Sequence, residues 1–537
     1  MRKFLMAVAM VGLAIAVATP AMALDFKFGA EYRVRFYDYN NINFDNSNQL
    51  YRGSPHGVQI RVRPRFDVSD DNGNIAATLR LEWGDTNFGA GGGANGSSWG
   101  TNDPGDIVGA PAGNRVGNGS GGSIGGDGVG VEVKWAFIDF AIPNVPLRIR
   151  AGLQPWYLPK GLVIDDDATG IRAYGNYGNF NYEAFWYRIA TTPTSVPPAG
   201  AAGTPGFVDT KDNNFDFFGA KLGYNFAEWL NASAWYMYGS NHANCTNPTY
   251  TVVGGVVTQV GATTGSYLTS CPGQEVNRSQ NWFGVDLTGK VKTIEYDLDF
   301  AYGQAKGGSN GTYVFNSINT AANPALPALA ANTAIDVKGW AIDGGVHIPI
   351  GPLKLNLLGT YASGDEGNND GSDSNAFPLG PGPSWSGAGG QYELIGEGGA
   401  FDVKSFTQHG PTGLYMLGFS LEYVPVKALW LKAWYGFAGF TGKWGNCAWA
   451  YSSVPSAAGS ANPQTLVQNP NTTCYGPTYF GKPSDSMVGE SYLGNEFGIR
   501  ADYTMWTGFK VQGMAGWLVP SAGDVASKYI IQLLYNF

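Results

Sequence analysis

Alternation of apolar and polar side chains recurs along this sequence and is clearest in its last ten residues. In residues 528–537, Tyr529 and Ile531 fall on one face of an extended chain, whereas Lys528 and Gln532 fall on the other. A strand with lipid on one side and water on the other must alternate in this way. A single strand with this pattern could arise by chance, so the fold is defined only if the rest of the chain repeats it.

The pattern recurs in about 18 segments of the roughly 9 to 11 residues that a tilted membrane strand needs. After the N-terminus, no run approaches the roughly 20 consecutive apolar residues of a membrane helix, although 44% of the residues are hydrophobic. The predicted strands are 25–38, 57–68, 73–84, 130–142, 146–154, 168–175, 179–188, 214–225, 229–239, 281–291, 293–303, 335–348, 352–362, 412–423, 427–438, 492–503, 506–518 and 526–537. The sequence therefore predicts an all-β fold, a transmembrane antiparallel β-barrel that occupies residues 24–537 as one domain.

The connections between these segments alternate between short and long. Barrels of this class have short turns at the periplasmic rim and long loops outside the cell. Short links such as 70–74 and 349–352 are therefore predicted to face the periplasm. The long loops fall near 85–128, 189–213, 240–280, 304–334, 363–411 and 439–491. With an even number of strands, both chain ends lie in the periplasm.

Residues 1–23 have the features of a secretory signal peptide. Arg2 and Lys3 precede an apolar run, and Ala21 and Ala23 offer the small residues that a signal peptidase recognises. A membrane anchor is the alternative, but the run is short for a membrane-spanning helix. We therefore expect cleavage before Leu24 and localisation in the bacterial outer membrane.

The four cysteines form two pairs that are local in sequence, and each pair lies in one predicted loop. Because the chain is exported to an oxidising compartment, two disulfides, Cys245 with Cys271 and Cys447 with Cys474, are predicted. A metal site is the rival interpretation, with His242 as a nearby ligand. The sequence contains no C-x-x-C-H haem attachment motif, and neither a cofactor nor a metal is expected.

Charged side chains identify the face that lines the lumen, because Arg or Lys facing lipid at the midplane costs about 2–4 kcal/mol. In the first strands, every arginine falls on the face opposite the apolar residues. The predicted pore-lining basic residues are Arg33, Arg35, Arg61, Arg63, Arg65, Arg80, Arg148 and Arg150. They either form structural salt bridges with Glu31, Asp67 and Glu82 or leave a net positive wall.

Strands near 281–303 place acidic residues on the inward face instead. The predicted pore-lining acidic residues are Asp286, Glu295, Asp297 and Asp299. If the barrel closes evenly, this wall lies across the lumen from the arginines. The two walls either set a transverse field that filters solutes or simply hydrate a wide lumen.

Residues 155–167 are unusual for an outside loop because they are apolar before three consecutive aspartates. One interpretation is a constriction loop inside the lumen that carries Asp165, Asp166 and Asp167 toward the arginines. The alternatives are an exposed divalent-cation site or a plain solvated acidic patch. Two strand irregularities are also predicted, an interrupted ladder at Pro64 and a bulge near Phe137 where the alternation changes phase.

The C-terminal strand that ends at Phe537 resembles the assembly signal of bacterial outer-membrane barrels, which implies recognition by the barrel-assembly machinery. The run from 136 to 154, with the Arg-rich opening strands, resembles the alginate-export-type porins and other barrels of about 18 strands. That resemblance implies passive export or uptake of anionic solutes through an arginine-lined pore. Where an arginine is expected in that family, the chain has Leu153 between Gly152 and Gln154. Carboxylate-uptake porins are as similar in architecture.

The predicted function is an outer-membrane porin, a water-filled channel for small anionic solutes. Its expected surroundings are outer-membrane lipid and lipopolysaccharide, and a homotrimer is left open. A net charge of −9 disfavours nucleic acid as a partner. The alternatives are a polysaccharide export pore and a sheath around an electron-transfer cytochrome. An enzymatic barrel is disfavoured because no histidine lies beside a suitable nucleophile, the four being His56, His242, His347 and His409.

Overall fold

The computed structural model describes residues 24–41, 56–88, 131–191, 214–241, 249–253, 256–260, 278–305, 337–364, 377–378, 387–396, 413–441, 449–451, 466–468, 491–521 and 523–537. Eighteen strands form one sheet: β1 (Leu24–Asn40), β2 (His56–Asp70), β3 (Ile75–Asn87), β4 (Val131–Ala141), β5 (Arg148–Tyr157), β6 (Asp165–Tyr177), β7 (Phe180–Thr191), β8 (Asn214–Ala227), β9 (Leu230–Asn241), β12 (Arg278–Val291), β13 (Ile294–Ala305), β14 (Val337–Ile350), β15 (Leu353–Ala362), β16 (Leu414–Val426), β17 (Leu429–Phe440), β20 (Tyr492–Trp506), β21 (Phe509–Pro520) and β22 (Ala526–Asn536). Two small separate sheets are β10 (Thr249–Val253) with β11 (Val256–Val260), and β18 (Trp449–Tyr451) with β19 (Leu466–Gln468).

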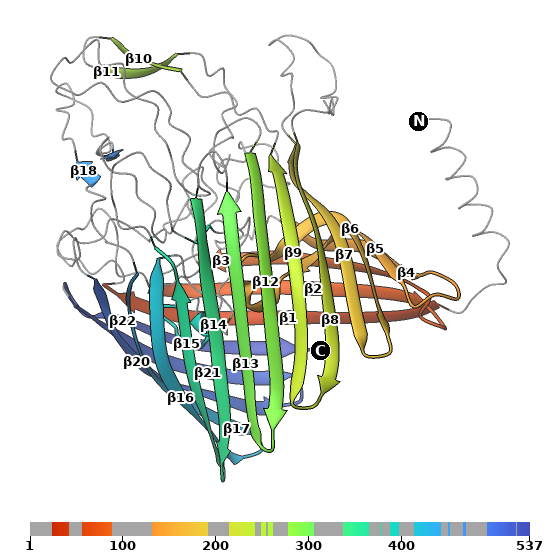
Figure 1. Ribbon diagram of the computed structural model, residues 1–537. Coiled ribbons are helices and arrows are strands. Elements are labelled where there is room, and N and C mark those ends of the chain that lie inside the picture. Colours follow the sequence, from red (N-terminus) through yellow and green to blue (C-terminus); the bar gives the residue numbers. More distant parts are fainter. Residues whose placement is uncertain are drawn as a thin grey trace.

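The large sheet closes on itself as a barrel. Each of its strands pairs antiparallel with the next one along the chain, and β1 pairs with both β2 and β22. At the seam, the Phe537 N–H donates to the Ala30 carbonyl at 3.2 Å, and the Ala30 N–H donates to the Phe537 carbonyl at 3.1 Å. Figure 1 shows the green strands of one wall in front of red and blue strands that come from the early and late parts of the sequence. The predicted fold class is confirmed, and each predicted strand coincides with a barrel strand.

The two ends of the barrel differ in their connections. At one end, short links join the strands at 71–74, 142–147, 178–179, 228–229, 292–293, 351–352, 427–428 and 507–508. Gly178 and Gly351 take positive φ angles of 59° and 60° in two of these turns, a conformation that favours glycine. At the other end, the long stretches of sequence between strands begin and end, for example after β3 at Asn87 and before β4 at Val131. By the rule for this class, the short turns face the periplasm, and Leu24 and Phe537 lie at that end.

The outer surface of the barrel is apolar. Leu222, Ile499 and Ile531 expose 64%, 59% and 56% of their surface, although they are large hydrophobic residues. Exposed aromatic side chains lie near both ends of the barrel, for example Trp506 near the short turns and Trp340 near the opposite end. A closed barrel with an apolar band between aromatic belts is the form that spans an outer membrane. Among the described residues, no helix is long and apolar enough to cross a membrane.

Two ladders of the opening strands are irregular. The β2–β3 register shifts between Ile60 and Val62 rather than at Pro64, and Val62 opposite Trp83 and Arg65 opposite Arg80 keep one register, although the ladder omits Arg63 and Pro64, the latter of which has no N–H to donate. In the β3–β4 ladder, Leu81 opposes Val133 and Arg80 opposes Trp135, so the extra residue is Lys134.

The bulge in β4 changes the phase of the strand, but it lies at Lys134 rather than near Phe137. Val133 before it and Ile138 after it both face outward, each 45% exposed. The bulge is placed there because the Lys134 ammonium pairs with Asp167 on β6 at 3.0 Å. A lysine on the lipid face would have no such partner.

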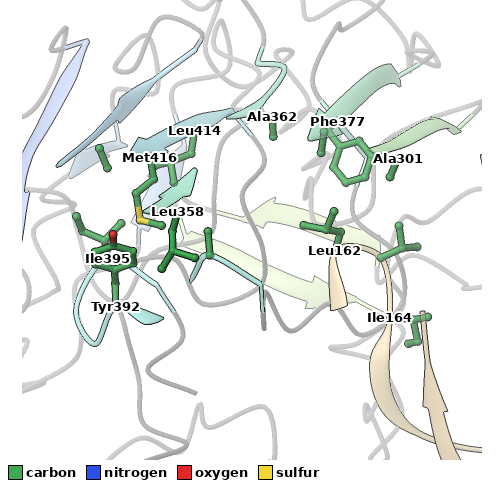
Figure 2. Close-up of a cluster of buried hydrophobic side chains, with 14 of the residues drawn as sticks. Leu162, Ile164, Ala301, Leu358, Ala362, Phe377, Tyr392, Ile395, Leu414 and Met416 are labelled. Carbon is green, nitrogen blue, oxygen red and sulfur yellow. The ribbon is translucent and has the colours of Figure 1, made fainter. Parts of the chain in front are cut away.

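The inward face of the loop half is apolar rather than charged. Wall residues from most of the barrel strands, together with two inward chain segments, form one buried cluster. Figure 2 shows Leu162, Ile164, Tyr392 and Ile395 from these segments and Phe377 from the separate stretch 377–378, with the wall residues Ala301, Leu358, Ala362, Leu414 and Met416. The lumen is therefore partly filled at this level.

Glycines on the inward face make room for the aromatic rings of this cluster. A Cβ at Gly284 would collide with the Trp235 ring, and one at Gly303 would collide with Trp282. In each case the glycine lies on the strand that follows the aromatic residue, so the ring lies across the neighbouring strand. Wide rings can in this way cover the wall without pushing the sheet apart.

Candidate functional site in the barrel lumen

The arginines predicted from sequence lie on the inward face, but at different depths. The side chains of Arg65 and Arg148 are 48% and 32% exposed, whereas that of Arg61 is 6% exposed. Arg33 and Arg35 are 2% and 3% exposed as whole residues. Arg65 and Arg148 are therefore open to the lumen, whereas the other three arginines are buried on its inward face.

Carboxylates pair with the arginines along this wall. Glu31 accepts from Arg61 at 2.9 Å and lies within 4 Å of Arg63 and Arg80. Asp139 accepts from both Arg148 and Arg150, at 2.7 and 2.8 Å. The remaining pairs join Arg63 to Glu82 at 2.6 Å and Arg65 to Asp67 at 2.7 Å. Four carboxylates thus lie among eight arginines.

Aromatic rings separate the guanidinium groups. Arg80 lies over the Trp135 ring at 4.5 Å, and Arg150 lies over Phe137 at the same distance. The face of an aromatic ring attracts a cation and holds its planar group in a fixed orientation. The β4 bulge therefore matters to the site, because Trp135 and Phe137 face the lumen after the phase change.

The acidic wall is more extensive than the sequence indicates. Asp286 on β12, Asp299 on β13 and Asp343 on β14 stand side by side in register. Asp297 lies two residues away on β13, and Glu295 lies near the turns, with its side chain 50% exposed. In the chain-order barrel, β2 and β13 are the second and eleventh of 18 strands, so half the circumference separates the two walls.

Lys160 crosses the lumen to this acidic wall. It belongs to the short 3₁₀ turn η1 (Pro159–Gly161), in a segment between β5 and β6 that folds inward. Its Nζ atom contacts Asp343 at 2.8 Å and Asp299 at 3.1 Å, and it also pairs with Asp297. Burial disfavours the charged ammonium, but the carboxylates of Asp343 and Asp299 outweigh this effect, so the pKa of Lys160 is raised.

The 155–167 segment does enter the lumen, but its aspartates are not the residues that reach across. Asp165, Asp166 and Asp167 are the first residues of β6 rather than part of a loop. Asp167 accepts from the Trp135 indole at 2.7 Å and pairs with Lys134. The aspartates remain on the strand because they pair with residues 155–157 of β5 and because Asp167 reaches the bulged β4, whereas the apolar residues before them turn inward.

A second inward segment, residues 387–396, docks on the opposite side. The Glu496 carboxylate accepts three consecutive backbone N–H groups, from Glu393 at 2.7 Å, Leu394 at 3.1 Å and Ile395 at 2.6 Å. The Trp434 indole donates to the same carboxylate at 2.9 Å. One buried anion thus holds a whole turn of chain against β20.

Two buried lysines hold the same segment. Lys432 on β17 donates to the Gln391 carbonyl at 3.0 Å and to its Oε1 atom at 2.8 Å. Lys528 on β22 donates to the Glu393 carbonyl. Burial raises the pKa of the Glu393 carboxyl, although the nearby lysines and Arg500 oppose this. These anchors span β17 to β22, so the segment extends along a quarter of the wall.

Sequence reasoning missed Lys160, Asp343, Glu496, Lys432 and Lys528. A signal existed for Lys160, since it is a lone cation between Pro159 and Gly161 in an apolar run. No local signal marks the others, because each is an ordinary polar residue at an inward position of its strand. Their importance comes from segments that are distant in sequence.

Several predictions fall on residues that the structure does not describe. The signal peptide at 1–23 and all four cysteines, Cys245, Cys271, Cys447 and Cys474, lie outside the described ranges, as do His242 and His409. His347 is described and bonds Asp297 at 2.8 Å and Asn356 at 2.8 Å. In the described part of the chain, no group of three His, Cys, Asp or Glu residues is arranged to hold a metal ion.

No family model and no curated protein matches the chain. Solved structures with a similar overall fold include the outer membrane protein OpdK from Pseudomonas aeruginosa, with a TM-score of 0.47 and 10% identity over 96% of this chain and 98% of that one. OccAB4 from Acinetobacter baumannii gives a TM-score of 0.47 and 9% identity over 96% and 99%. A BenF-like porin from Pseudomonas fluorescens Pf-5 gives 0.47 and 10% over 96% and 98%.

The chain's own geometry defines its class without these likenesses. A closed sheet of 18 antiparallel strands has an apolar outer surface and charged groups inside. The protein is therefore an integral outer-membrane β-barrel with an inward-facing charged site.

Proposed function

We propose that this barrel is a porin for small anionic solutes. The observation that carries the proposal is the unequal neutralisation of the two walls. On the acidic wall, four lysines face five carboxylates: Lys160 contacts three aspartates, Lys221 lies 3.5 Å from Asp286, and Lys290 and Lys354 lie 3.6 and 4.0 Å from Glu295. On the basic wall, four carboxylates pair with six of the eight arginines. A solute in the lumen therefore meets a net positive potential.

The same contacts weaken the transverse field that the sequence leaves open. A field between two walls requires each wall to keep its charge. Lys160 supplies a cation in the centre of the acidic wall, so the lumen is biased toward one sign of charge. The lumen is then expected to select solutes by the sign of their charge rather than by their dipole moment.

The two alternative functions receive less support. A sheath for a cytochrome needs an open bore, whereas segments 158–164 and 387–396 pack inside this one. The alginate-export-type interpretation remains compatible with a basic wall, because a polyuronate is also an anion. The same inward segments favour small solutes over a polymer.

Reversal potentials in planar bilayers under a KCl gradient test the proposal. Wild type is expected to be anion-selective, and Arg65→Gln with Arg148→Gln is expected to move the reversal potential toward zero, because these two side chains are the most exposed of the wall. Arg61→Gln is the matched control, since the same charge is removed from a side chain that is 6% exposed. Raising the salt concentration should reduce the difference by screening.

Two outcomes would contradict the proposal. Cation selectivity in the wild type would show that the acidic wall dominates despite Lys160. Absence of conductance in a correctly folded barrel would show that the inward segments close the lumen.

A further inference from the structure

Asp343 is the point at which the two inward segments meet. Its side chain is fully buried on β14. It accepts from Lys160 Nζ at 2.8 Å and from the backbone N–H of Ala388 at 2.9 Å, and the Thr360 hydroxyl also donates to it. Lys160 belongs to segment 158–164 and Ala388 to segment 387–396. One carboxylate therefore holds a residue from each segment.

The segments also touch each other beside this carboxylate. A Cβ at Gly387 would lie 2.8 Å from Lys160 Cδ and would collide with the Asp343 carboxylate. No side chain larger than hydrogen fits between the lysine stem and Asp343. The contact thus depends on a glycine in one segment and a lysine in the other.

The other anchors of the two segments lie far from each other. Segment 158–164 is otherwise held by the contacts of Lys160 with Asp297 and Asp299 on β13 and by hydrogen bonds within itself, from Leu158 N–H to the Ile164 carbonyl at 2.9 Å and from Gly161 N–H to the Leu158 carbonyl at 3.0 Å. Segment 387–396 is held on β17, β20 and β22 through Lys432, Glu496 and Lys528. Asp343 lies on neither of those walls.

We propose that Asp343 couples the docking of the two segments, so that they open and close together as one gate. When Lys160 moves away from Asp343, the Asp343 carboxylate that accepts from the Ala388 N–H is held less firmly. The contact between the Lys160 stem and Gly387 is also lost. When segment 387–396 leaves, Lys160 loses the surface that packs its stem. Coupling of this kind must be reciprocal, because each event changes the free energy of the other by the same amount. The consequence for conductance rests on the proposed porin function, whereas the coupling does not.

Hydrogen exchange on the purified barrel in detergent micelles tests the coupling from both directions. Lys160→Met is expected to raise exchange at the amides of 393–395, which Lys160 does not contact, by about ten-fold. Glu496→Gln is expected to raise exchange at Leu158 and Gly161 by a similar factor. Lys221→Met is the control, because it removes a lysine from Asp286 on the same acidic wall without touching either segment.

Asp343→Asn and Gly387→Ala complete the design. Asp343→Asn removes the charge that holds both segments, so adding Lys160→Met to it should raise exchange at 393–395 much less than Lys160→Met does in the wild type. Gly387→Ala separates the two segments at Asp343 without changing any charge, so it should raise hydrogen exchange in both of them. It replaces Lys160→Met as the test if Lys160→Met impairs folding. Electrophoretic migration of the unheated protein verifies that each variant is a folded barrel.

The coupling is overturned if Lys160→Met and Gly387→Ala each affect exchange in 158–164 or 387–396 alone. It is also overturned if Lys160→Met acts equally in the presence and absence of Asp343. Reciprocal exchange effects in a barrel that does not conduct would support the coupling and would refute the proposed function separately.

Discussion

Gly284 on β12 gives a quantitative test of how the interior is packed. A Cβ at this position would lie 2.6 Å from Nε1 of Trp235, closer than Cβ atoms approach their neighbours in proteins. Trp235 is 5% exposed within the buried cluster, so its ring has no open space to enter. Gly284→Ala is therefore expected to lower the free energy of unfolding by about 1–3 kcal/mol through overpacking.

Gly513 on β21 provides a control of opposite sign. A Cβ at Gly513 meets no atom within 4 Å, so the same substitution adds no clash. Alanine also reduces the conformational freedom of the unfolded chain, which stabilises the folded state by about 0.4–1 kcal/mol. The two Gly→Ala variants are thus expected to differ by about 1.5–4 kcal/mol.

Urea unfolding in lipid vesicles, followed by electrophoretic migration of the unheated protein, measures both free energies. Trp235→Phe removes the part of the ring that the new methyl group would strike. The double variant should therefore recover most of the stability that Gly284→Ala loses, and a double-mutant cycle gives the coupling. Equal stability of the Gly284→Ala and Gly513→Ala variants, within about 0.5 kcal/mol, would refute the packing argument.

Three further predictions concern the seam, the second inward segment and the basic wall. Phe537→Ala removes ring contacts with Phe28 at 5.7 Å and Tyr32 at 6.2 Å; it should destabilise the seam by about 0.5–1.5 kcal/mol and lower the folded fraction seen by electrophoresis. Because the pKa of Glu393 is raised, the docked segment binds more protons than the free segment, so docking is strongest below about pH 4.5 and weakens as the pH rises. Exchange at 393–395, corrected for intrinsic rates, should therefore increase from pH 5 to pH 8, and Glu393→Gln should remove the trend. Asp139→Asn weakens two arginine hydrogen bonds at 2.7 and 2.8 Å, so urea unfolding should show a loss of about 1–3 kcal/mol, and an unchanged midpoint would contradict the pairing.

The strands could be predicted because residues two positions apart in a membrane strand face the same side, either the lipid or the lumen. In β1, an arginine on the lipid face would cost more than any local preference could recover, so the position of Arg33 fixes the face of the whole strand. The same reasoning placed Asp286 and Asp299 inward on β12 and β13. The strand order could then be predicted, because a short turn lets a strand pair only with the strand that follows it in the chain.

Alternation could not predict the apolar half of the lumen. In β9, the inward Trp235 and Met237 are as apolar as the outward Tyr236, and both faces would be acceptable in lipid. Which face the tryptophan takes is decided by Gly284 on the next strand and by the segments that cover it. Those contacts are long-range, so the sequence of β9 alone does not contain them.

The contact of Lys160 with the acidic wall joins residues 137 and 183 positions apart, and no periodic pattern carries information over that distance. Charge balance does limit which residues Lys160 can contact. A lysine in an apolar segment that folds inward must either meet carboxylates or lose its charge, because an isolated buried ammonium costs several kcal/mol. The acidic wall deduced from β12 and β13 supplies such carboxylates. An inward fold of segment 155–167 thus implies a lysine pairing with that wall, and it leaves Asp167 of β6 to Trp135 and Lys134 on the bulged β4.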